Sequence, residues 1–429
     1  MTTTMSTALL TDHYELTMLQ AALRSGAASR GAVFEVFARR LPGARRYGVV
    51  AGTGRVLEAL EHFRFGEDEL AFLRDNRVVD APTLDFLAGY RFSGRVYGYR
   101  EGECYFPGSP IMTVEGTFAE AVLLETLILS ILNHDCAIAG AASRMVYAAG
   151  GRPIIEMGSR RTHEMSAVAA ARAAYLCGFA ATSNLMAGRV HGVPTAGTAA
   201  HAFTLLHDSE EQAFGAQLAS LGTGTTLLVD TYDVAQAVRT AVELAGPELG
   251  AVRLDSGDLA EAAREVRAQL DALGAHRTRI LVTSDLDEHA IAALAAAPVD
   301  GYGVGTSLVT GSGSPTAALV YKLVAREDAA GVMRPVAKKS VGKPSRGGRK
   351  DAFRELDETG TAVAELVVTS GDRPAGARPL QAELVRDGEI VGRESLEDAR
   401  ARHRRTFAEL PATAHQLSRG DVALPTVFD

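Results

Sequence analysis

Residues 252–258 read Val-Arg-Leu-Asp-Ser-Gly-Asp and join the end of an apolar run to an arginine and two carboxylates. Apolar residues recur at helical spacing over residues 259–266, so the stretch predicts a strand, a polar turn and a helix. Asp258 is a suitable residue to cap that helix. Two interpretations remain open: a capped turn in which Arg253 pairs with Asp255, or a loop that binds an anionic ligand.

The same succession of a short apolar run, a polar loop and a helical pattern recurs from residue 153 to residue 304. Repeated βα units predict a parallel sheet, and a closed or nearly closed barrel is its simplest form. Because the carboxyl ends of parallel strands share one edge, the loops that follow them should converge. The predicted fold class is therefore α/β, with an irregular parallel barrel. The candidate strands are residues 153–157, 178–182, 193–196, 225–229, 251–254, 279–282 and 301–304.

The segments on either side of the barrel predict a second, α+β domain. Between residues 90 and 114, short alternating segments separated by Gly and Pro indicate an antiparallel sheet. Asp-Gly within residues 383–391 indicates a hairpin, so the C-terminal region is expected to complete this sheet domain. The predicted divisions are an N-terminal sheet and helix domain at 1–135, the barrel at 136–325, and a C-terminal region at 326–429 that packs on the N-terminal domain.

Composition favours a protein whose partners are small molecules. The net charge of -8 argues against a general nucleic-acid binder, whose binding surface is basic. The three cysteines show neither metal-ligand spacing nor a disulfide framework, which indicates buried thiols in a reducing compartment. The start of the chain lacks a signal-peptide pattern, and the most apolar run, 119–132, contains two glutamates and is too short to span a bilayer. We expect a soluble, cytoplasmic protein without a membrane or nucleic-acid partner.

Polar loops follow most of the candidate strands. Gly-Ser-Arg-Arg-Thr-His at 158–163 opens a helix and suits an anion, although a plain surface loop is equally consistent. Asn184 follows the second run, and His201 lies at a glycine-rich helix start after the third, where a structural histidine is the alternative. Two further loops, residues 230–233 and 284–287, contain two aspartates each, and Asp233 and Asp287 are candidate helix caps.

A cluster of glycines and hydroxyl residues follows the last candidate strand. Residues 301–310 read Gly-Tyr-Gly-Val-Gly-Thr-Ser-Leu-Val-Thr, and such glycines let backbone amides approach a phosphate. Phosphate sites in barrels commonly lie after the late strands. The run matches neither a Walker P-loop nor a dinucleotide-binding fingerprint.

Two segments outside the predicted barrel also carry candidate site residues. A helix is predicted from Thr11, as N-cap, to about Leu23, and Asp12 and Tyr14 in it are either cap and packing residues or part of a site. The glycine-rich segment 338–350 is basic without an acid, which is consistent with a phosphate-attracting loop or with a solvated surface. Its cations are Lys338, Lys339, Lys343, Arg346, Arg349 and Lys350.

Five segments together resemble the motif set of the nicotinate phosphoribosyltransferases, and they cover nearly the whole chain. The resemblance implies a type II phosphoribosyltransferase fold and a homodimer with shared active sites. The implied reaction joins nicotinate to 5-phosphoribosyl 1-diphosphate, with ATP hydrolysis coupled to turnover, as the first step of NAD salvage from nicotinate. The segments are Thr-Asp-His-Tyr-Glu-Leu-Thr-Met at 11–18, Gly-Ser-Arg-Arg at 158–161, Gly-Thr-Ala-Ala-His at 197–201, Arg-Leu-Asp-Ser-Gly-Asp at 253–258 and Gly-Val-Gly-Thr-Ser at 303–307.

The resemblance also implies roles for single residues. Arg253 and Thr198 would hold the nicotinate carboxylate or ring, which Tyr14 of a neighbouring subunit would cover. Asp255 and Asp258 would orient the ribose hydroxyls and the Mg²⁺-bound diphosphate, with Asp255 as the candidate metal contact. His201 would accept a phosphoryl group from ATP. The 5-phosphate would lie on Gly305 and Thr306, and the other implied substrate-binding positions are Asp12, Arg160, Asn184 and Thr310.

Two alternative functions remain open on this scaffold. One is a nicotinamide phosphoribosyltransferase, whose members carry an aspartate where this chain has Asn184. An asparagine suits a substrate carboxylate better, because it adds no negative charge beside it. The other is a non-catalytic regulatory protein that binds phosphoribosyl compounds or nucleotides, against which the presence of His201, Asp255 and Asp258 argues.

Overall fold

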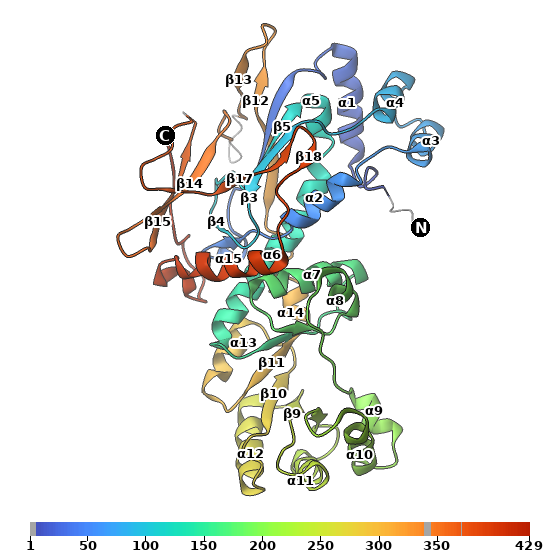
Figure 1. Cartoon of the computed structure of the whole chain (residues 1–429), viewed down its shortest axis with the longest axis vertical. Helices are drawn as coiled ribbons and strands as arrows, with labels where there is room; N and C mark the ends of the chain where they lie inside the picture. The colour runs from blue at the N-terminus through green and yellow to red at the C-terminus, as the bar shows by residue number, and fades with distance from the viewer. Residues whose placement is uncertain (1–5, 339–344, 370) are drawn as a thin grey trace. The chain divides into compact units, whose positions relative to one another are not determined.

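The computed structural model describes residues 6–338, 345–369 and 371–429, and its contacts divide the chain into two compact units. Unit 1 comprises residues 1–140 and 314–429, and unit 2 comprises residues 141–313. Figure 1 shows the helices and strands of both units along the chain.

Unit 1 is built on an antiparallel sheet with strands from both ends of the chain. Its order is β13-β12-β1-β5-β3-β17-β18. The Asp-Gly hairpin signal is confirmed, since β17 and β18 pair around Asp387 and Gly388, which both have positive φ. These strands are β1 (Gly31–Ala38), β3 (Arg95–Tyr99), β5 (Met112–Thr117), β12 (Leu319–Glu327), β13 (Met333–Pro335), β17 (Gln381–Arg386) and β18 (Glu389–Ile390).

Two smaller sheets and a set of helices complete unit 1. A four-stranded sheet has the order β16-β14-β15-β19, and β2 pairs with β4. The strands are β2 (Gly48–Val49), β4 (Cys104–Tyr105), β14 (Asp351–Leu356), β15 (Ala362–Val368), β16 (Arg378–Pro379) and β19 (Thr426–Phe428). The helices are α1 (His13–Ser25), α2 (Thr53–Glu61), α3 (Glu67–Asp75), α4 (Ala81–Ala88), α5 (Phe118–Val122), α6 (Glu125–Ala149) and α15 (Leu396–Ala408), with 3-10 turns η1 (Pro42–Ala44) and η3 (Ala412–His415).

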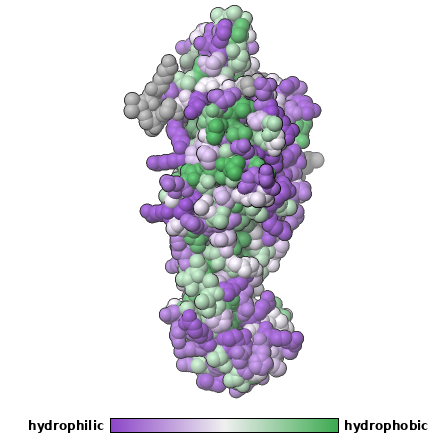
Figure 2. Space-filling view, turned by 90° about the vertical axis from the view of Figure 1, so that its left-hand side faces the viewer, coloured by the Kyte–Doolittle hydropathy of each residue, from purple (hydrophilic) through white to green (hydrophobic). Residues whose placement is uncertain are grey.

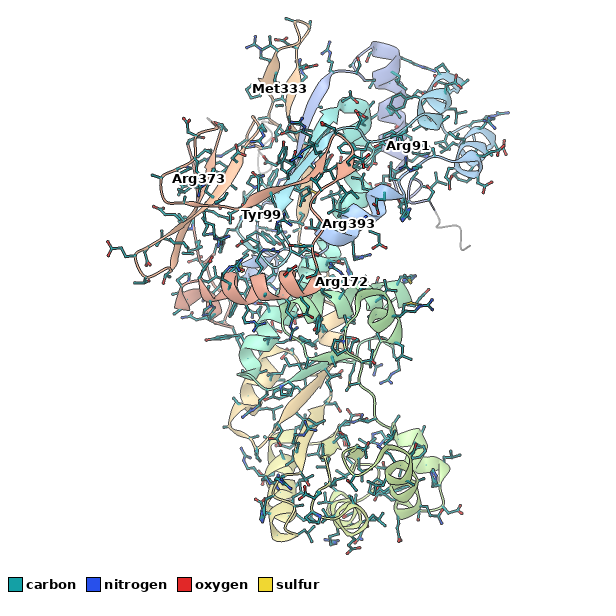
Figure 3. All side chains as sticks on the ribbon, in the orientation of Figure 1. Arg91, Tyr99, Arg172, Met333, Arg373 and Arg393 are labelled. Atoms are coloured by element: carbon teal, nitrogen blue, oxygen red, sulfur yellow. The ribbon has the colours of Figure 1, made fainter. Side chains whose placement is uncertain are left out.

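The interior of unit 1 holds an ion cluster among apolar side chains. Arg354 and Glu365 are both fully buried, with 3.4 Å between Nη2 and Oε1. The hydroxyl of Tyr99, which Figure 3 labels, donates to Glu365 Oε1 at 2.9 Å. Burial raises the pKa of the Glu365 carboxyl, and the guanidinium of Arg354 opposes that rise. Removing one partner would therefore leave an uncompensated buried charge.

Helices α5 and α6 form the one described stretch that is long and apolar enough to cross a membrane. Over residues 118–149 the mean hydropathy of the best window reaches 1.5, but 67% of that window is buried inside the structure. Such burial is typical of a core helix, because its apolar side chains already have protein neighbours.

Unit 2 confirms the predicted α/β class. Its parallel sheet has the order β7-β6-β11-β10-β9-β8, and β9, β10 and β11 can be followed in Figure 1. The strands are β6 (Ile154–Glu156), β7 (Ala181–Thr182), β8 (Thr226–Leu228), β9 (Ala251–Leu254), β10 (Arg279–Thr283) and β11 (Gly301–Val304). The helices are α7 (Glu164–Cys177), α8 (Leu185–His191), α9 (His201–Leu206), α10 (Glu210–Leu221), α11 (Val234–Ala245), α12 (Leu259–Ala272), α13 (Glu288–Ala293) and α14 (Thr306–Val309), with the 3-10 turn η2 (Leu294–Ala296).

Six of the seven candidate strands form, and the prediction of a strand at 193–196 is wrong. That segment makes a single parallel bridge, between Thr195 and Thr182 of β7. Pro194 has no backbone N–H to donate, which weakens pairing on that side. The parallel sheet is therefore open, with β7 and β8 as its outer strands, and resembles an incomplete barrel.

Candidate active site

The loops after the parallel strands of unit 2 lie at one edge of the sheet. Neighbouring strands pair in parallel register from β7 to β8, so every strand ends at the same side. The connections that follow β6, β7, β9 and β11 carry most of the candidate residues from the sequence. This edge is the place where several loops can build one site.

Asp230, directly after β8, holds the loop that follows β9. Its Oδ2 accepts the backbone N–H of Asp255 at 2.8 Å and the hydroxyl of Ser256 at 2.7 Å. Thr283, the last residue of β10, donates its hydroxyl to Asp255 Oδ1. Asp255 is thus held through its backbone N–H by Asp230 and through its carboxylate by Thr283. It does not form the ion pair with Arg253 that a simple capped turn would need.

His201 lies between two carboxylates at the start of α9. Its Nε2 is 3.8 Å from Asp230 Oδ1 and 3.8 Å from Asp255 Oδ2, and its Nδ1 is 3.2 Å from Thr231 Oγ1. The imidazole is 40% exposed, whereas the Asp230 side chain is 3% exposed. The contact of Nδ1 with Thr231 sets the orientation of the ring, so that Nε2 faces both carboxylates.

Arg253 forms part of the wall of a cavity of about 320 Å³ inside the parallel sheet. Its Nη1 donates to Thr198 Oγ1 at 2.6 Å, while its buried Nε has no hydrogen-bond partner among the described residues. Burial lowers the pKa of Arg253, Asp255 and Asp230 oppose this, and the charge of Arg160 lowers the pKa further. Met157 and Thr283 also line the cavity, whose wall is mostly apolar. A cation in such a wall suits a small planar anion.

Asn184 and Ser159 connect the loops after β7 and β6. Asn184 Nδ2 donates to Ser159 Oγ at 2.9 Å, and Asn184 Oδ1 accepts the N–H of Ala187 at 2.9 Å as the N-cap of α8. The amide orientation is therefore set by two protein contacts. Arg160 follows Ser159 directly and is close enough to Arg253 to affect its pKa.

The loop after β11 packs closely on the loop after β6. A Cβ at Gly158 would lie 2.2 Å from Val309 Cγ1 and 3.2 Å from Gly305 O, so only glycine fits there. Gly305 and Thr306 begin the short helix α14. Thr310 donates its hydroxyl to Thr306 O at 2.8 Å, so that hydroxyl bonds to its own helix.

Asp258 has the helix-cap contacts that the sequence allowed as an alternative. Its Oδ1 accepts the N–H groups of Ala260 and Glu261, both at 3.1 Å, and the residue is exposed. Asp233 and Asp287 also prove to be caps, of α11 and α13.

The candidates outside the barrel lie in unit 1. Helix α1 begins at His13 with Asp12 at the N-cap position, so the prediction of Thr11 as the cap is wrong: Thr11 donates instead to Glu15. Tyr14 is 43% exposed, and burial together with the neighbouring Glu125 carboxylate raises the pKa of its hydroxyl.

Most described cations of the basic segment already have partners in unit 1. Lys350 is buried against Glu35 at 2.9 Å. Arg349 contacts Glu115 at 2.9 Å and Asp351, while Arg346 lies over the ring of Phe428. Lys338 is exposed, and Lys339 and Lys343 lie outside the described residues. These contacts favour a structural role for Arg349 and Lys350.

Similarity to known proteins identifies the family of this chain. Residues 9–133 match the nicotinate phosphoribosyltransferase N-terminal domain. The chain is 59% identical over 97% of its length to nicotinate phosphoribosyltransferase pncB1 of Mycobacterium tuberculosis, covering 94% of that protein. The chain belongs to the nicotinate phosphoribosyltransferase family.

Other members of the family extend the match. The nicotinate phosphoribosyltransferase of Bacillus subtilis is 38% identical over 82% of this chain and 74% of that protein. The crystal structure of human nicotinic acid phosphoribosyltransferase superposes with a TM-score of 0.84 at 26% identity, covering 97% of both chains. The fold of the whole chain is therefore that of a nicotinate phosphoribosyltransferase.

Sequence reasoning missed Asp230 and Met157 in this phosphoribosyltransferase. Asp230 lay in a recognised acidic loop, but nothing in the pattern distinguished it from the cap residue Asp233. Met157 ends an apolar run and gave no polar signal, yet it lines the cavity beside Arg253. The signal that could have indicated Asp230 and Met157 was their position at the carboxyl end of a predicted strand.

We predict that Arg253→Lys raises the KM for nicotinate by about tenfold, because lysine cannot take a carboxylate through two parallel hydrogen bonds. Steady-state kinetics at saturating 5-phosphoribosyl 1-diphosphate measures the effect. Arg264→Lys, on α12 and outside the lining of the cavity, is the matched control and should leave this KM unchanged. A folded Arg253→Lys enzyme with wild-type KM would contradict the role.

Proposed function

We propose that this chain transfers the phosphoribosyl group of 5-phosphoribosyl 1-diphosphate to nicotinate, which gives nicotinate mononucleotide and diphosphate, the first step of NAD salvage from nicotinate. The observation that carries the proposal is the position of Arg253. Arg253 lines an apolar cavity together with Gly197 and Thr198, and His201, three residues after Thr198, lies 3.8 Å from Asp255. An acid and an anionic sugar phosphate can thus meet at one edge of the sheet.

Nicotinate binds in the cavity with its carboxylate toward Arg253 and Thr198. Nη1 of Arg253 donates to Thr198, and Nε has no partner among the described residues. The guanidinium therefore has N–H groups left to donate to a substrate carboxylate. Met157 offers an apolar contact for the pyridine ring. Asn184, held by Ser159 and Ala187, follows β7 at the same edge of the sheet and adds no negative charge there. These features favour the acid over its amide.

The sugar phosphate lies across the loops after β6, β9 and β11. The N–H groups at Gly305 and Thr306 are directed to the 5-phosphate, with Thr310 supporting the turn. Arg160 attracts the diphosphate through its charge. Asp255, fixed by Thr283 and Asp230, accepts hydrogen bonds from the ribose hydroxyls. For Asp258 we propose a weaker, water-mediated share in this contact beside its role as helix cap.

We propose Mg²⁺ as the metal cofactor, because the carboxylates at this edge of the sheet are suitable ligands for it. The described residues hold no group of three or more metal-ligating side chains. Asp255 and the unpartnered Oδ1 of Asp230 match a Mg²⁺ that is held by one or two carboxylates and substrate phosphates. When bound there, Mg²⁺ neutralises charge on the diphosphate leaving group.

The reaction displaces diphosphate from the anomeric carbon, and the nitrogen of nicotinate forms the new bond. As the carbon–oxygen bond lengthens, positive charge develops on the ribose and negative charge on the diphosphate. The carboxylate of Asp255 stabilises the positive charge on the ribose, and Arg160 stabilises the negative charge on the diphosphate. Arg253 holds the pyridine so that its ring nitrogen meets the sugar carbon, and the chain needs no covalent nucleophile.

The experiment that tests the proposed function is product formation with nicotinate and with nicotinamide, each with and without ATP. We expect nicotinate to be preferred. Asn184→Asp keeps the oxygen that caps α8, so the fold should hold while a new negative charge repels the acid. The KM for nicotinate should rise several-fold, and that for nicotinamide should not. A preference of the wild type for nicotinamide would favour the alternative enzyme, and no product at all would favour a regulatory protein.

We further propose that ATP phosphorylates His201. Its Nε2 is directed between Asp230 and Asp255, and its Nδ1 contacts Thr231, so one nitrogen is presented toward the site. An imidazole nitrogen is a nucleophile that can accept a phosphoryl group. The phosphoryl group passes from the γ-position of ATP to this nitrogen, and ADP leaves.

Incubation with ATP and Mg²⁺ should give an acid-labile, base-stable phosphoryl group that is absent from His201→Ala. That variant should lose stimulation by ATP and keep a slow ATP-independent transfer, because the contacts of Asp255 and Arg253 remain. His207→Ala, at the end of the same helix, is the control and should label normally. Labelling that survives in His201→Ala would place the phosphate elsewhere.

A homodimer with shared sites is the assembly we propose. Exposed apolar side chains support it: Tyr14 and Met18 on α1, and Leu185, Met186 and Val190 on α8. Figure 2 shows hydrophobic patches among hydrophilic residues on the face in view. Tyr14 and Asp12 of one subunit would then cover the nicotinate site of its partner.

Mixing two defective subunits tests this arrangement. Tyr14→Ala and Arg253→Ala homodimers should each use nicotinate poorly, whereas mixed dimers regain one site with both residues intact. Activity in the mixture should exceed the sum of its parts, and sedimentation should give a dimer. A monomer, or a mixture without added activity, would contradict shared sites.

A cytoplasmic location is the last part of the proposal. Cys104, Cys136 and Cys177 are all buried thiols, as expected in a reducing compartment. Burial raises the pKa of the Cys104 thiol to about 12, which keeps it protonated and unreactive.

A further inference from the structure

Glu156 is a buried acid at the edge of the sheet that bears the proposed site, and the reaction itself does not use it. It is the last residue of β6 and lies opposite Thr182 of β7 on one side and Val304 of β11 on the other. The residue is 1% exposed. Its side chain therefore stands where the loops after three strands begin.

The carboxylate closes a ring of hydrogen bonds between two of these loops. It accepts the N–H of Gly158 through Oε1 and the hydroxyl of Thr182 through Oε2. Thr182 Oγ1 in turn accepts the N–H of Asn184 at 2.9 Å. Asn184 Nδ2 donates to Ser159 Oγ at 2.9 Å, which returns the ring to the loop after β6.

The third loop is held by packing against the same point. Gly158 touches Val309 and Gly305 so closely that a side chain there would collide with both, and Met157 N–H donates to Val304 O at 2.7 Å. A shift of Gly158 would therefore move the start of α14 as well. Glu156 therefore affects three loops: those after β6 and β7 through its hydrogen bonds, and the loop after β11 through the packing of Gly158.

A merely space-filling role does not account for an acid at this position. No ion pair with Glu156 occurs among the described residues, and burial raises the pKa of its carboxyl. An acid buried without a cation is costly, and an apolar side chain would fill the same space more favourably. The carboxylate of Glu156 supplies two hydrogen-bond acceptors, one for Gly158 after β6 and one for Thr182 at the end of β7.

We propose that Glu156 is a positioning residue that sets the spacing of Arg160, Asn184 and the Gly305–Thr306 turn for the two substrates. The inference rests on the proposed substrate contacts of these residues. It assigns Glu156 no contact with the reacting atoms. Its loss should thus act on substrate binding and alignment, through the loops.

Two substitutions at Glu156 separate geometry from charge. Glu156→Ala removes both acceptors, and a loop misplaced by an ångström lowers kcat/KM by about 10- to 100-fold, with raised KM for both substrates. Glu156→Gln keeps an acceptor for Gly158 and can donate to Thr182 Oγ1 once that hydroxyl turns, so kcat/KM should stay within about threefold of wild type. Thr182→Val keeps the side-chain shape but lacks the hydroxyl, so it should lower kcat/KM in the same way as Glu156→Ala but by a smaller factor. Thr182→Ser keeps the hydroxyl and should restore activity.

Glu365→Gln is the control for lost stability, since it alters a buried acid in unit 1 far along the chain from the site loops. It should lower the melting temperature without changing either KM. Arg160→Ala tests the proposed contact between Arg160 and the diphosphate separately. An unchanged KM for 5-phosphoribosyl 1-diphosphate would reject that contact, and the role of Glu156 would then be tested by the KM for nicotinate alone. Glu156→Ala that folds with both KM values within twofold of wild type would overturn the inference, as would Glu156→Gln that is as impaired as Glu156→Ala.

Discussion

The arrangement of the site depends on the carboxylate of Asp230. One of its oxygens accepts from the backbone of Asp255 and from Ser256, and the other faces His201. A buried acid that accepts two hydrogen bonds from one loop restricts that loop far more than a solvated side chain could. Without Asp230, both the orientation of Asp255 and the environment of the His201 imidazole would change together.

Two buried polar atoms at this edge have no partner among the described residues, and they carry opposite charge. They are Nε of Arg253 and Oδ1 of Asp230. An unsatisfied buried group costs about 1–3 kcal/mol, so both atoms are kept at some expense to stability. A substrate carboxylate at Arg253 and a cation or hydroxyl near Asp230 would satisfy them. The site is thus less stable empty than filled, which is expected of a preorganised binding site.

The sequence predicted the fold class, six strands of the parallel sheet and the convergence of Arg253, Asp255 and His201 on one edge. These features follow from periodicity and from the geometry of parallel strands, which are local or shared properties. Pro194 shows why the seventh strand failed, because pairing depended on an N–H that proline lacks. The contacts of Thr310 and Asn184 could not be predicted, and for Asp258 the sequence left a helix cap and a ligand contact both open, since the two use the same residue types. The roles of the site residues remain predictions.

Three buried acids of unit 2 share one function in the structure. Glu156 holds the loops after β6 and β7, and Asp230 holds the loop after β9. Glu288 accepts from Ser312, just beyond α14, at 2.7 Å and pairs with Arg144 at 2.9 Å.

Each of these acids is committed to protein hydrogen bonds, so none of them pairs with Arg253 or Arg160. The described residues form no ion pair with either arginine. Their positive charges therefore remain available for the carboxylate of one substrate and the phosphates of the other. An acid free to rotate at this edge would form such a pair, and the anions would then have to displace it at a cost in affinity. The hydrogen bonds that fix the loops are thus also what keeps the two arginines open to anionic substrates.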